Sequence, residues 1–218
     1  MMSLLEVKKR GDAAVCTLQG SGSASLLSVN ALRELHQVID GVLADSGTSA
    51  VIITGGNNNF FSAGADLREL SLLEDETSLM FSRLGQSLFE KMEQLSKPII
   101  AAVDGFCMGG GLDLLLACDL RYATPGSTFA HPGSRFGIIT GFGGTVRLPA
   151  EIGYARACDI FISARVLEAQ EALEIGLING IIGRELLLDH CLEIAKRLNT
   201  LDRGVFRLFK QGVVRGLF

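Results

Sequence analysis

The stretch KPIIAAVDGFCMGGGLD, residues 97–113, decides the fold class of this chain. Pro98 is followed by the apolar run Ile99–Val103, which predicts a short buried strand. The glycines Gly109–Gly111 then allow a tight turn, and the apolar segment Gly111–Cys118 predicts a buried helix. A strand, a turn of small residues and a helix in direct succession indicate an α/β layered fold.

A second stretch, FSAGADL at residues 61–67, repeats this arrangement. It follows the strand expected at Val51–Thr54, and Asp66 is placed to cap a short helix through Leu70. Backbone N–H groups at the start of a helix have no partner within it, so such turns bind anions or developing negative charge. Two converging turns would form an oxyanion hole. The alternative interpretation is that both turns serve only tight helix packing.

The rest of the chain alternates strands and helices in the same way. We expect further strands at Leu4–Val7, Ala13–Leu18, Asp119–Ala123, Thr128–Ala130 and Gly180–Ile182. We expect helices from a Ser28 cap to Leu43, from Thr77 to Leu95, and over most of Thr145–Phe218. The sequence has no internal repeat and no low-complexity tract that would interrupt this pattern.

The composition excludes several classes of protein. The 218 residues are 48% hydrophobic and 20% charged, which excludes a disordered chain and a coiled coil. The net charge of −4, with scattered Lys and Arg, argues against a nucleic-acid surface. The 5 cysteines form no Cys-x-x-Cys pair and the 3 histidines have no metal-ligand spacing. This spacing of the cysteines and histidines favours reduced thiols in a cytoplasmic protein without a metal site.

A membrane segment and a signal peptide are also disfavoured. Residues 99–118 are long enough to span a bilayer, but Asp104 and Asp113 would each cost about 2.5–3.5 kcal/mol at its centre. The first ten residues include Glu6, Lys8 and Lys9, so they lack the apolar core of a signal peptide.

Nucleotide-binding loops provide no better interpretation of the glycines. A Walker loop requires Gly-Lys-Ser/Thr, and that triplet does not occur. Gly109–Gly111 lacks the Gly-x-Gly-x-x-Gly spacing of a dinucleotide site, and Gly141–Gly144 does not follow a convincing strand. An NAD-dependent reductase is therefore the weakest of the function hypotheses.

Several motifs together identify a family. FSAGADL, with TGG before it at residues 54–56, resembles one signature of the crotonase (enoyl-CoA hydratase/isomerase) superfamily. The stretch at residues 97–113 resembles the second signature. CDLRYA at 118–123, GGTVRLP at 143–149 and EALEIGL at 171–177 are similar to further landmarks of that family. The resemblance extends over about Leu5–Leu198, and two long motifs at the expected separation make it specific.

The resemblance implies a fold and an assembly. We expect an α/β protein with a crotonase-like ββα spiral core and a helical C-terminal region. Residues 1–198 would form the acyl-CoA domain, and residues 199–218 a short helical tail, because family members commonly run some tens of residues longer. The family implies an acyl-CoA thioester as substrate, no separate cofactor, and a homotrimer or hexamer.

The resemblance also implies a site. The oxyanion donors would be the backbone N–H groups of Ala65 and Gly110, which would polarise the thioester carbonyl and hold the enolate. The CoA moiety would lie against segments 25–28 and 63–65. The residues expected to bind substrate are therefore Ser25, Leu26, Leu27, Ala63, Gly64, Ala65, Gly109 and Gly110.

The proton-transfer residues depart from the family pattern. Hydratases of the family use two glutamates, and the first falls at Asp113, whose carboxylate reaches about 1.5 Å less far. The second falls at Gly133, which cannot transfer protons, so we expect weak hydration and a gain from Gly133→Glu if the pocket is otherwise intact. His131 is a candidate replacement because the intrinsic pKa of imidazole suits acid–base work.

Each candidate also has a structural interpretation. Asp113 can be a first-turn acid that only meets the helix dipole, and His131 can be a structural histidine bonded to backbone. Arg135 is a candidate to bind a phosphate or carboxylate, with a surface or structural ion pair as the favoured interpretation, and Asp104 is expected to be a turn residue.

Two function classes remain open. The first is an enzyme of the hydratase/isomerase type, in which Asp113, Ala65, Gly110 and His131 are catalytic; with one carboxylate, isomerisation is easier than two-glutamate hydration. Decarboxylation or thioester hydrolysis on the same oxyanion hole is compatible with the pattern. The second class is a catalytically degenerate homologue that binds acyl-CoA, and such a protein would be indifferent to Asp113→Asn.

Overall fold

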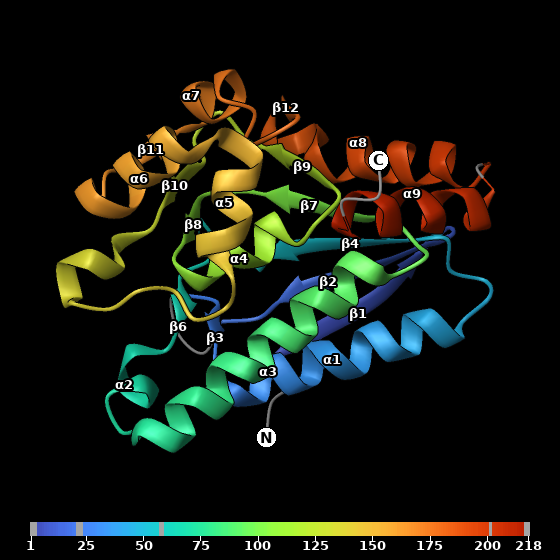
Figure 1. The fold of residues 1–218 in the computed structure, drawn as a ribbon. Coiled ribbons are helices and arrows are strands. Elements are labelled where there is room, and N and C mark those ends of the chain that lie inside the picture. Colours follow the sequence, from blue (N-terminus) through green and yellow to red (C-terminus); the bar gives the residue numbers. More distant parts are fainter. Residues whose placement is uncertain (1–3, 21–23, 57–58, 201, 216–218) are drawn as a thin grey trace.

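A six-stranded sheet runs through the molecule in a computed structural model that describes residues 4–20, 24–56, 59–200 and 202–215 (Figure 1). Its strand order is β1-β2-β4-β7-β9-β12. β1 and β2 pair antiparallel, and the remaining neighbours pair parallel. The strands are β1 (Leu5–Arg10), β2 (Ala13–Leu18), β4 (Ala50–Gly55), β7 (Ile99–Val103), β9 (Leu120–Ala123) and β12 (Gly180–Ile181).

A second, smaller sheet receives the chain after it leaves β4, β7 and β9. Its order is β11-β10-β8-β5, and a separate two-stranded ladder joins β3 to β6. These strands are β3 (Leu26–Leu27), β5 (Phe60–Ser62), β6 (Gly64–Ala65), β8 (Phe106–Met108), β10 (Thr128–Ala130) and β11 (Leu167–Glu168). The pairs β4–β5, β7–β8 and β9–β10 are each followed by helical structure. This repetition confirms the predicted ββα spiral.

Helices cover both faces of the large sheet. The helices of the described residues are α1 (Val29–Ala44), α2 (Leu67–Leu70), α3 (Asp75–Gln94), α4 (Gly110–Leu116), α5 (Gly144–Ile152), α6 (Tyr154–Ser163), α7 (Ala169–Glu174), α8 (Arg184–Leu198) and α9 (Arg203–Arg215), with a 3-10 turn, η1, at Pro132–Phe136. Figure 1 shows α1 and α3 side by side on one face, with α8 on the other. Ser28 caps α1 as predicted, because its Oγ accepts from the N–H of Ala31 at 3.1 Å.

Alternating strand residues build two apolar cores. Side chains such as Cys16 and Ile53 face the larger core, which α1, α3 and α4 complete. Their neighbours in sequence, Val15 and Ile52, face a smaller core beneath Leu187 of α8. The parallel strands are therefore covered on both faces, which explains their nearly continuous apolar sequences.

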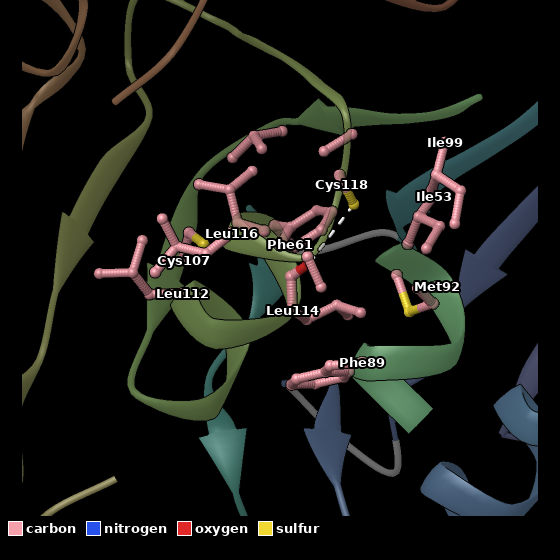
Figure 2. Packing of buried hydrophobic residues seen from close by; sticks show 14 of the residues in the cluster. Ile53, Phe61, Phe89, Met92, Ile99, Cys107, Leu112, Leu114, Leu116 and Cys118 are labelled. Carbon is pink, nitrogen blue, oxygen red and sulfur yellow. Dashed lines mark hydrogen bonds between the residues drawn. The ribbon is translucent and has the colours of Figure 1, made fainter. Parts of the chain in front are cut away.

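Helix α4 lies in the larger core and is buried on all sides. Figure 2 shows Leu112, Leu114 and Leu116 of this helix, with Phe61 and Phe89 packed near them. The segment 99–118 is thus a buried strand, a short strand and a buried helix. In the described part of the chain, no helix combines the length and apolar character needed to cross a membrane.

Candidate active site

The two glycine turns expected to converge do so at Gly64 and Gly110. Gly64 has a φ of +86°, and a Cβ there would lie 2.6 Å from the Met108 oxygen and 2.7 Å from the Gly110 nitrogen. A Cβ on Gly110 would lie 3.4 Å from the nitrogen of Ala65. The backbone nitrogens of Ala65 and Gly110 therefore belong to neighbouring segments, which approach this closely because neither glycine has a side chain.

The first turn is held in place by the segment before α1. Residues Leu26 and Leu27 pair in parallel with Gly64 and Ala65. The N–H of Ala63 donates to the Ser25 carbonyl at 2.9 Å. Segments 25–27 and 63–65, which are the predicted substrate-binding segments, thus lie side by side.

Strand pairing brings His131 to the second turn. β8 and β10 pair in parallel with Met108 opposite Ala130, so the residues that follow each strand, Gly109 and His131, are neighbours. The N–H of Gly109 donates to the Ala130 carbonyl at 2.9 Å. Gly110 is the first residue of α4, and an N–H at that position has no partner within its own helix.

Asp113 and His131 face each other in the protein interior. Asp113 is one turn into α4 with none of its surface exposed, and His131 is 3% exposed. Nε2 of His131 lies 3.2 Å from Oδ1 of Asp113, and the His131 ring stacks on Phe161 with centroids 4.6 Å apart. Oδ2 of Asp113 accepts a hydrogen bond from the hydroxyl of Thr140. Asp113 is therefore not a solvated first-turn acid.

Two atoms of this pair lack a hydrogen bond. Within the described residues, neither Oδ1 of Asp113 nor Nε2 of His131 has a partner with hydrogen-bond geometry, although they are 3.2 Å apart. Most buried polar side-chain atoms are bonded, and the exceptions include catalytic groups. A carboxylate and an imidazole this close can pass a proton to each other or to a third group that contacts either of them.

Phe142, in the loop before α5, and Gly144, the first residue of α5, lie against the two turns and Asp113. Gly144 lies so close to Oδ1 of Asp113 that no side chain fits there. The ring of Phe142 packs on Gly110, since a Cβ on that glycine would lie 3.0 Å from the ring. Phe142 also makes edge contacts with Phe81 and Phe89, at centroid distances of 5.0 and 5.9 Å.

Gly133 has no space for a side chain. It lies in η1, and a Cβ there would be 2.6 Å from the carbonyl oxygen of Ile138. Because backbone cannot yield as a flexible side chain does, the region has a different shape from one that holds a glutamate. A side chain at Gly133 would therefore require the backbone at Ile138 to move.

The nearby cysteine is not a nucleophile candidate. Burial raises the pKa of the Cys107 thiol well above its ordinary value. Cys107 is completely buried, so it stays a neutral apolar side chain. Among the described residues, no group of three or more His, Cys, Asp or Glu is arranged to hold a metal ion.

A cavity opens beside the predicted CoA segments. It has a volume of about 280 Å³ and is lined by Leu4, Gln19, Leu26, Ser28, Asp66 and Glu69. Glu69 also accepts a hydrogen bond from the N–H of Val29 at 3.2 Å, which ties α2 to the start of α1. Leu26 and Ser28 come from a segment that the resemblance assigned to CoA, whereas Glu69 carried no signal in the sequence.

Two further residues singled out in the sequence are Asp104 and Arg135. Asp104 accepts from the Thr124 hydroxyl at 3.0 Å and pairs with Arg184 at 3.0 Å, which fits a turn residue. Arg135 is exposed on η1.

Comparison with known proteins decides the family. Residues 10–217 match the family described as enoyl-CoA hydratase/isomerase. The chain belongs to this family. The short-chain-enoyl-CoA hydratase of Clostridium acetobutylicum is 36% identical over 211 residues, which are 97% of this chain and 81% of the relative. The crotonyl-CoA hydratase of Syntrophomonas wolfei is 35% identical with the same coverage.

Solved structures agree with this assignment. The enoyl-CoA hydratase from Bacillus anthracis superposes with a TM-score of 0.92 at 32% identity, covering 98% of this chain and 83% of that one. DspI of Pseudomonas aeruginosa also superposes with a TM-score of 0.92, at 29% identity over 97% of this chain and 86% of that one. The fold is therefore the crotonase fold, and the protein is an enzyme of the enoyl-CoA hydratase/isomerase type.

Proposed function

We propose that this enzyme moves a proton on an enolate of an acyl-CoA thioester, with Asp113 and His131 as its acid–base pair. The observation that carries the proposal is the buried pair itself: two atoms 3.2 Å apart, both without hydrogen bonds, beside the turn at Gly110. Relatives named as hydratases of short-chain enoyl-CoA and crotonyl-CoA support an acyl-CoA substrate.

The thioester oxygen would accept from the N–H groups of Ala65 and Gly110. The close approach of the two backbone segments supports the proposal, because each segment limits the positions that the other can adopt. Preorganised backbone donors stabilise the negative charge that develops when a proton leaves the carbon next to the carbonyl. The CoA moiety would follow segments 25–28 and 63–65, where the cavity at Leu26 and Ser28 lies, and no separate cofactor is needed.

Isomerisation is the reaction that this arrangement supports best. Asp113 would take a proton from the α-carbon of a 3-enoyl thioester, and the electron pair would move onto the carbonyl oxygen. Returning the same proton to the γ-carbon shifts the double bond next to the carbonyl, so one carboxylate serves both half-reactions. His131, beside Asp113, would interact with the carboxylate in both protonation states.

Hydration of a 2-enoyl thioester is the second candidate. It requires a water to add at the β-carbon and a proton to arrive at the α-carbon. The proximity of His131 favours it, because imidazole can accept the proton of that water. We expect hydration to be the slower reaction, since Gly133 occupies the position where the family places its second glutamate.

A mass-spectrometric panel tests the proposal. The protein would be incubated with 3-enoyl-CoA, crotonyl-CoA and malonyl-type CoA esters, in parallel with Asp113→Asn. We expect conversion of 3-enoyl-CoA that depends on Asp113. Binding of the esters without any conversion would instead support the degenerate acyl-CoA-binding homologue, and release of CO₂ or free CoA would support decarboxylation or thioester hydrolysis.

We also propose that the enzyme assembles as a homotrimer or hexamer. Large apolar side chains that are more than 60% exposed on η1, α5, α6 and the intervening loops support self-association; they are Phe136, Ile139, Val146, Tyr154 and Ile162. Light scattering at micromolar concentration is the measurement, and a stable monomer would contradict this assembly.

A further inference from the structure

We propose that Thr140 is a positioning residue that fixes the orientation of the Asp113 carboxylate. This inference rests on the proposed function, because it concerns the same acid–base pair. Thr140 lies in the loop between η1 and α5, and neither signature stretch contains it. Its hydroxyl donates to Oδ2 of Asp113.

A second hydrogen bond directs the hydroxyl proton. The N–H of Phe142 donates to Oγ1 of Thr140 at 3.4 Å, so the threonine oxygen already accepts one bond. A hydroxyl has one proton to donate, and the Asp113 carboxylate is the acceptor placed to receive it. The backbone of the loop thereby orients the threonine, and the threonine orients the aspartate.

The two carboxylate oxygens of Asp113 therefore have different roles. With Oδ2 held by Thr140, rotation of the carboxylate is restricted and Oδ1 stays turned toward His131, 3.2 Å away. Gly144 lies against Oδ1 from another direction, which leaves little room for a second orientation. Oδ1 is the oxygen without a hydrogen bond, and it is therefore the one available to the substrate proton.

The short side chain of Asp113 cannot adjust its reach. Its distance from the substrate is set by the position of α4, and the direction of its carboxylate by the groups that bond it. A misplacement of about 1 Å at a reacting group can cost about 100-fold in rate. Thr140 should accordingly affect the chemical step and leave binding of the CoA ester unchanged.

Two matched variants test the inference. Thr140→Val preserves the shape of the side chain and removes the hydroxyl, whereas Thr140→Ser preserves the hydroxyl and removes a methyl group. We expect Thr140→Val to lower kcat on 3-enoyl-CoA about 10-fold to 100-fold with KM unchanged, in line with the cost of misplacing a reacting group. Thr140→Ser should retain most of kcat. Thermal melts of both variants identify any general loss of folding.

An NMR measurement does not depend on turnover. The ring signals of His131, assigned by their loss in His131→Gln, should shift in Thr140→Val and stay in place in Thr140→Ser. Unchanged signals together with unchanged kcat in Thr140→Val would overturn the inference. If the wild-type protein converts no ester, the proposed function fails while the ring signals still decide whether Thr140 positions Asp113.

Discussion

Asp113 is the residue on which the proposed chemistry depends most. It has no exposed surface, one of its oxygens is bonded to Thr140, and the other faces His131. Asp113→Asn keeps the volume of the side chain but cannot accept a proton, so we expect turnover to fall about 10²-fold to 10⁴-fold. Binding of the CoA ester, measured by calorimetry, should persist. Undiminished turnover in the folded variant would contradict a catalytic role.

His131 should contribute less than Asp113. A single carboxylate can carry the proton in isomerisation, so we expect His131→Gln to slow that reaction less than Asp113→Asn does, and to affect hydration more. His190 is a matched control, because its Nε2 is also buried without a hydrogen bond but its ring packs on Tyr122, beneath the other core. Steady-state rates of His131→Gln and His190→Gln on both esters provide the comparison. Equal losses in the two variants would indicate a general effect on stability.

Gly133→Glu is expected to give no gain in hydration. A Cβ at this position would lie 2.6 Å from the Ile138 oxygen, so the loop must move before any side chain fits. We expect a lower melting temperature and no faster conversion of crotonyl-CoA. A clear rise in hydration with an unchanged melting temperature would show that the loop adapts and that the pocket of a two-glutamate enzyme is still present.

At the scale of elements, the site is formed by short segments whose backbones are in contact. The turn at Gly64 approaches the start of α4 more closely than any side chain allows. Gly111 is similarly close to Ser62, because a Cβ on Gly111 would lie 2.5 Å from the Ser62 carbonyl oxygen. Oxyanion geometry in this enzyme would therefore depend on glycines that bind nothing themselves.

Gly64→Ala tests that dependence. The residue has a φ of +86°, a region that costs a non-glycine residue about 1–3 kcal/mol, and its Cβ would collide with Met108 and Gly110. We expect a loss of stability, measured by chemical denaturation, and a disproportionate loss of turnover, measured by steady-state rates. Gly41→Ala is the control, because a Cβ there meets nothing within 4 Å inside α1, and alanine favours a helix by up to about 1 kcal/mol. Parallel behaviour of the two variants would refute the argument.

The sequence predicted long elements better than short ones. The buried strand Ile99–Val103 and the helix capped by Ser28 are confirmed, because an apolar run and a helical period extend over enough residues to be recognised. The two-residue strands β3 and β6 have no period at all and were missed, whereas β10 and the short β12 lie where strands were expected. β1 continues to Arg10 through charged residues because its outer edge is exposed, which the apolar pattern could not indicate.

The site was predictable in part for the same reason. Family motifs identified Asp113 and both glycine turns, which lie within the quoted stretches, and His131 was singled out because it stands two residues before Gly133. Thr140 and Phe142 meet Asp113 and Gly110 only through the path of the loop before α5. A threonine or phenylalanine in a glycine-rich loop has no pattern that reveals such a tertiary contact.

At the scale of the whole molecule, a buried lysine ties the C-terminal helix to the core. α9 lies beside the C-terminal end of α3 (Figure 1). Lys210 is 5% exposed and donates to the Met92 carbonyl at 2.9 Å and to Asp119 at 3.0 Å. Leu208 and Phe209 of the same helix are about 60% exposed, so α9 turns a charge inward and apolar side chains outward. The helix is therefore held by polar contacts, and its stability should depend on pH.

Asp119 supplies that dependence. Burial raises the pKa of its carboxyl group above the ordinary value, although Lys210 and the N–H of Ile99 oppose the rise. A raised pKa means that the folded state binds the proton more tightly, so this contribution to stability is complete below the unfolded pKa of about 3.9. It is then lost as the pH rises through the folded pKa. Asp119→Asn should remove this slope from the free energy of unfolding.

Lys210→Met provides the decisive comparison. Without the ammonium group, the pKa of Asp119 should rise further, because burial then acts with less opposition. The loss of stability above about pH 4, near the unfolded carboxyl pKa, should become larger and extend to higher pH than in the wild-type protein. Urea unfolding at several pH values above 4, at one protein concentration, measures both curves. If the Lys210→Met and wild-type curves run parallel, the ion pair with Asp119 does not anchor α9.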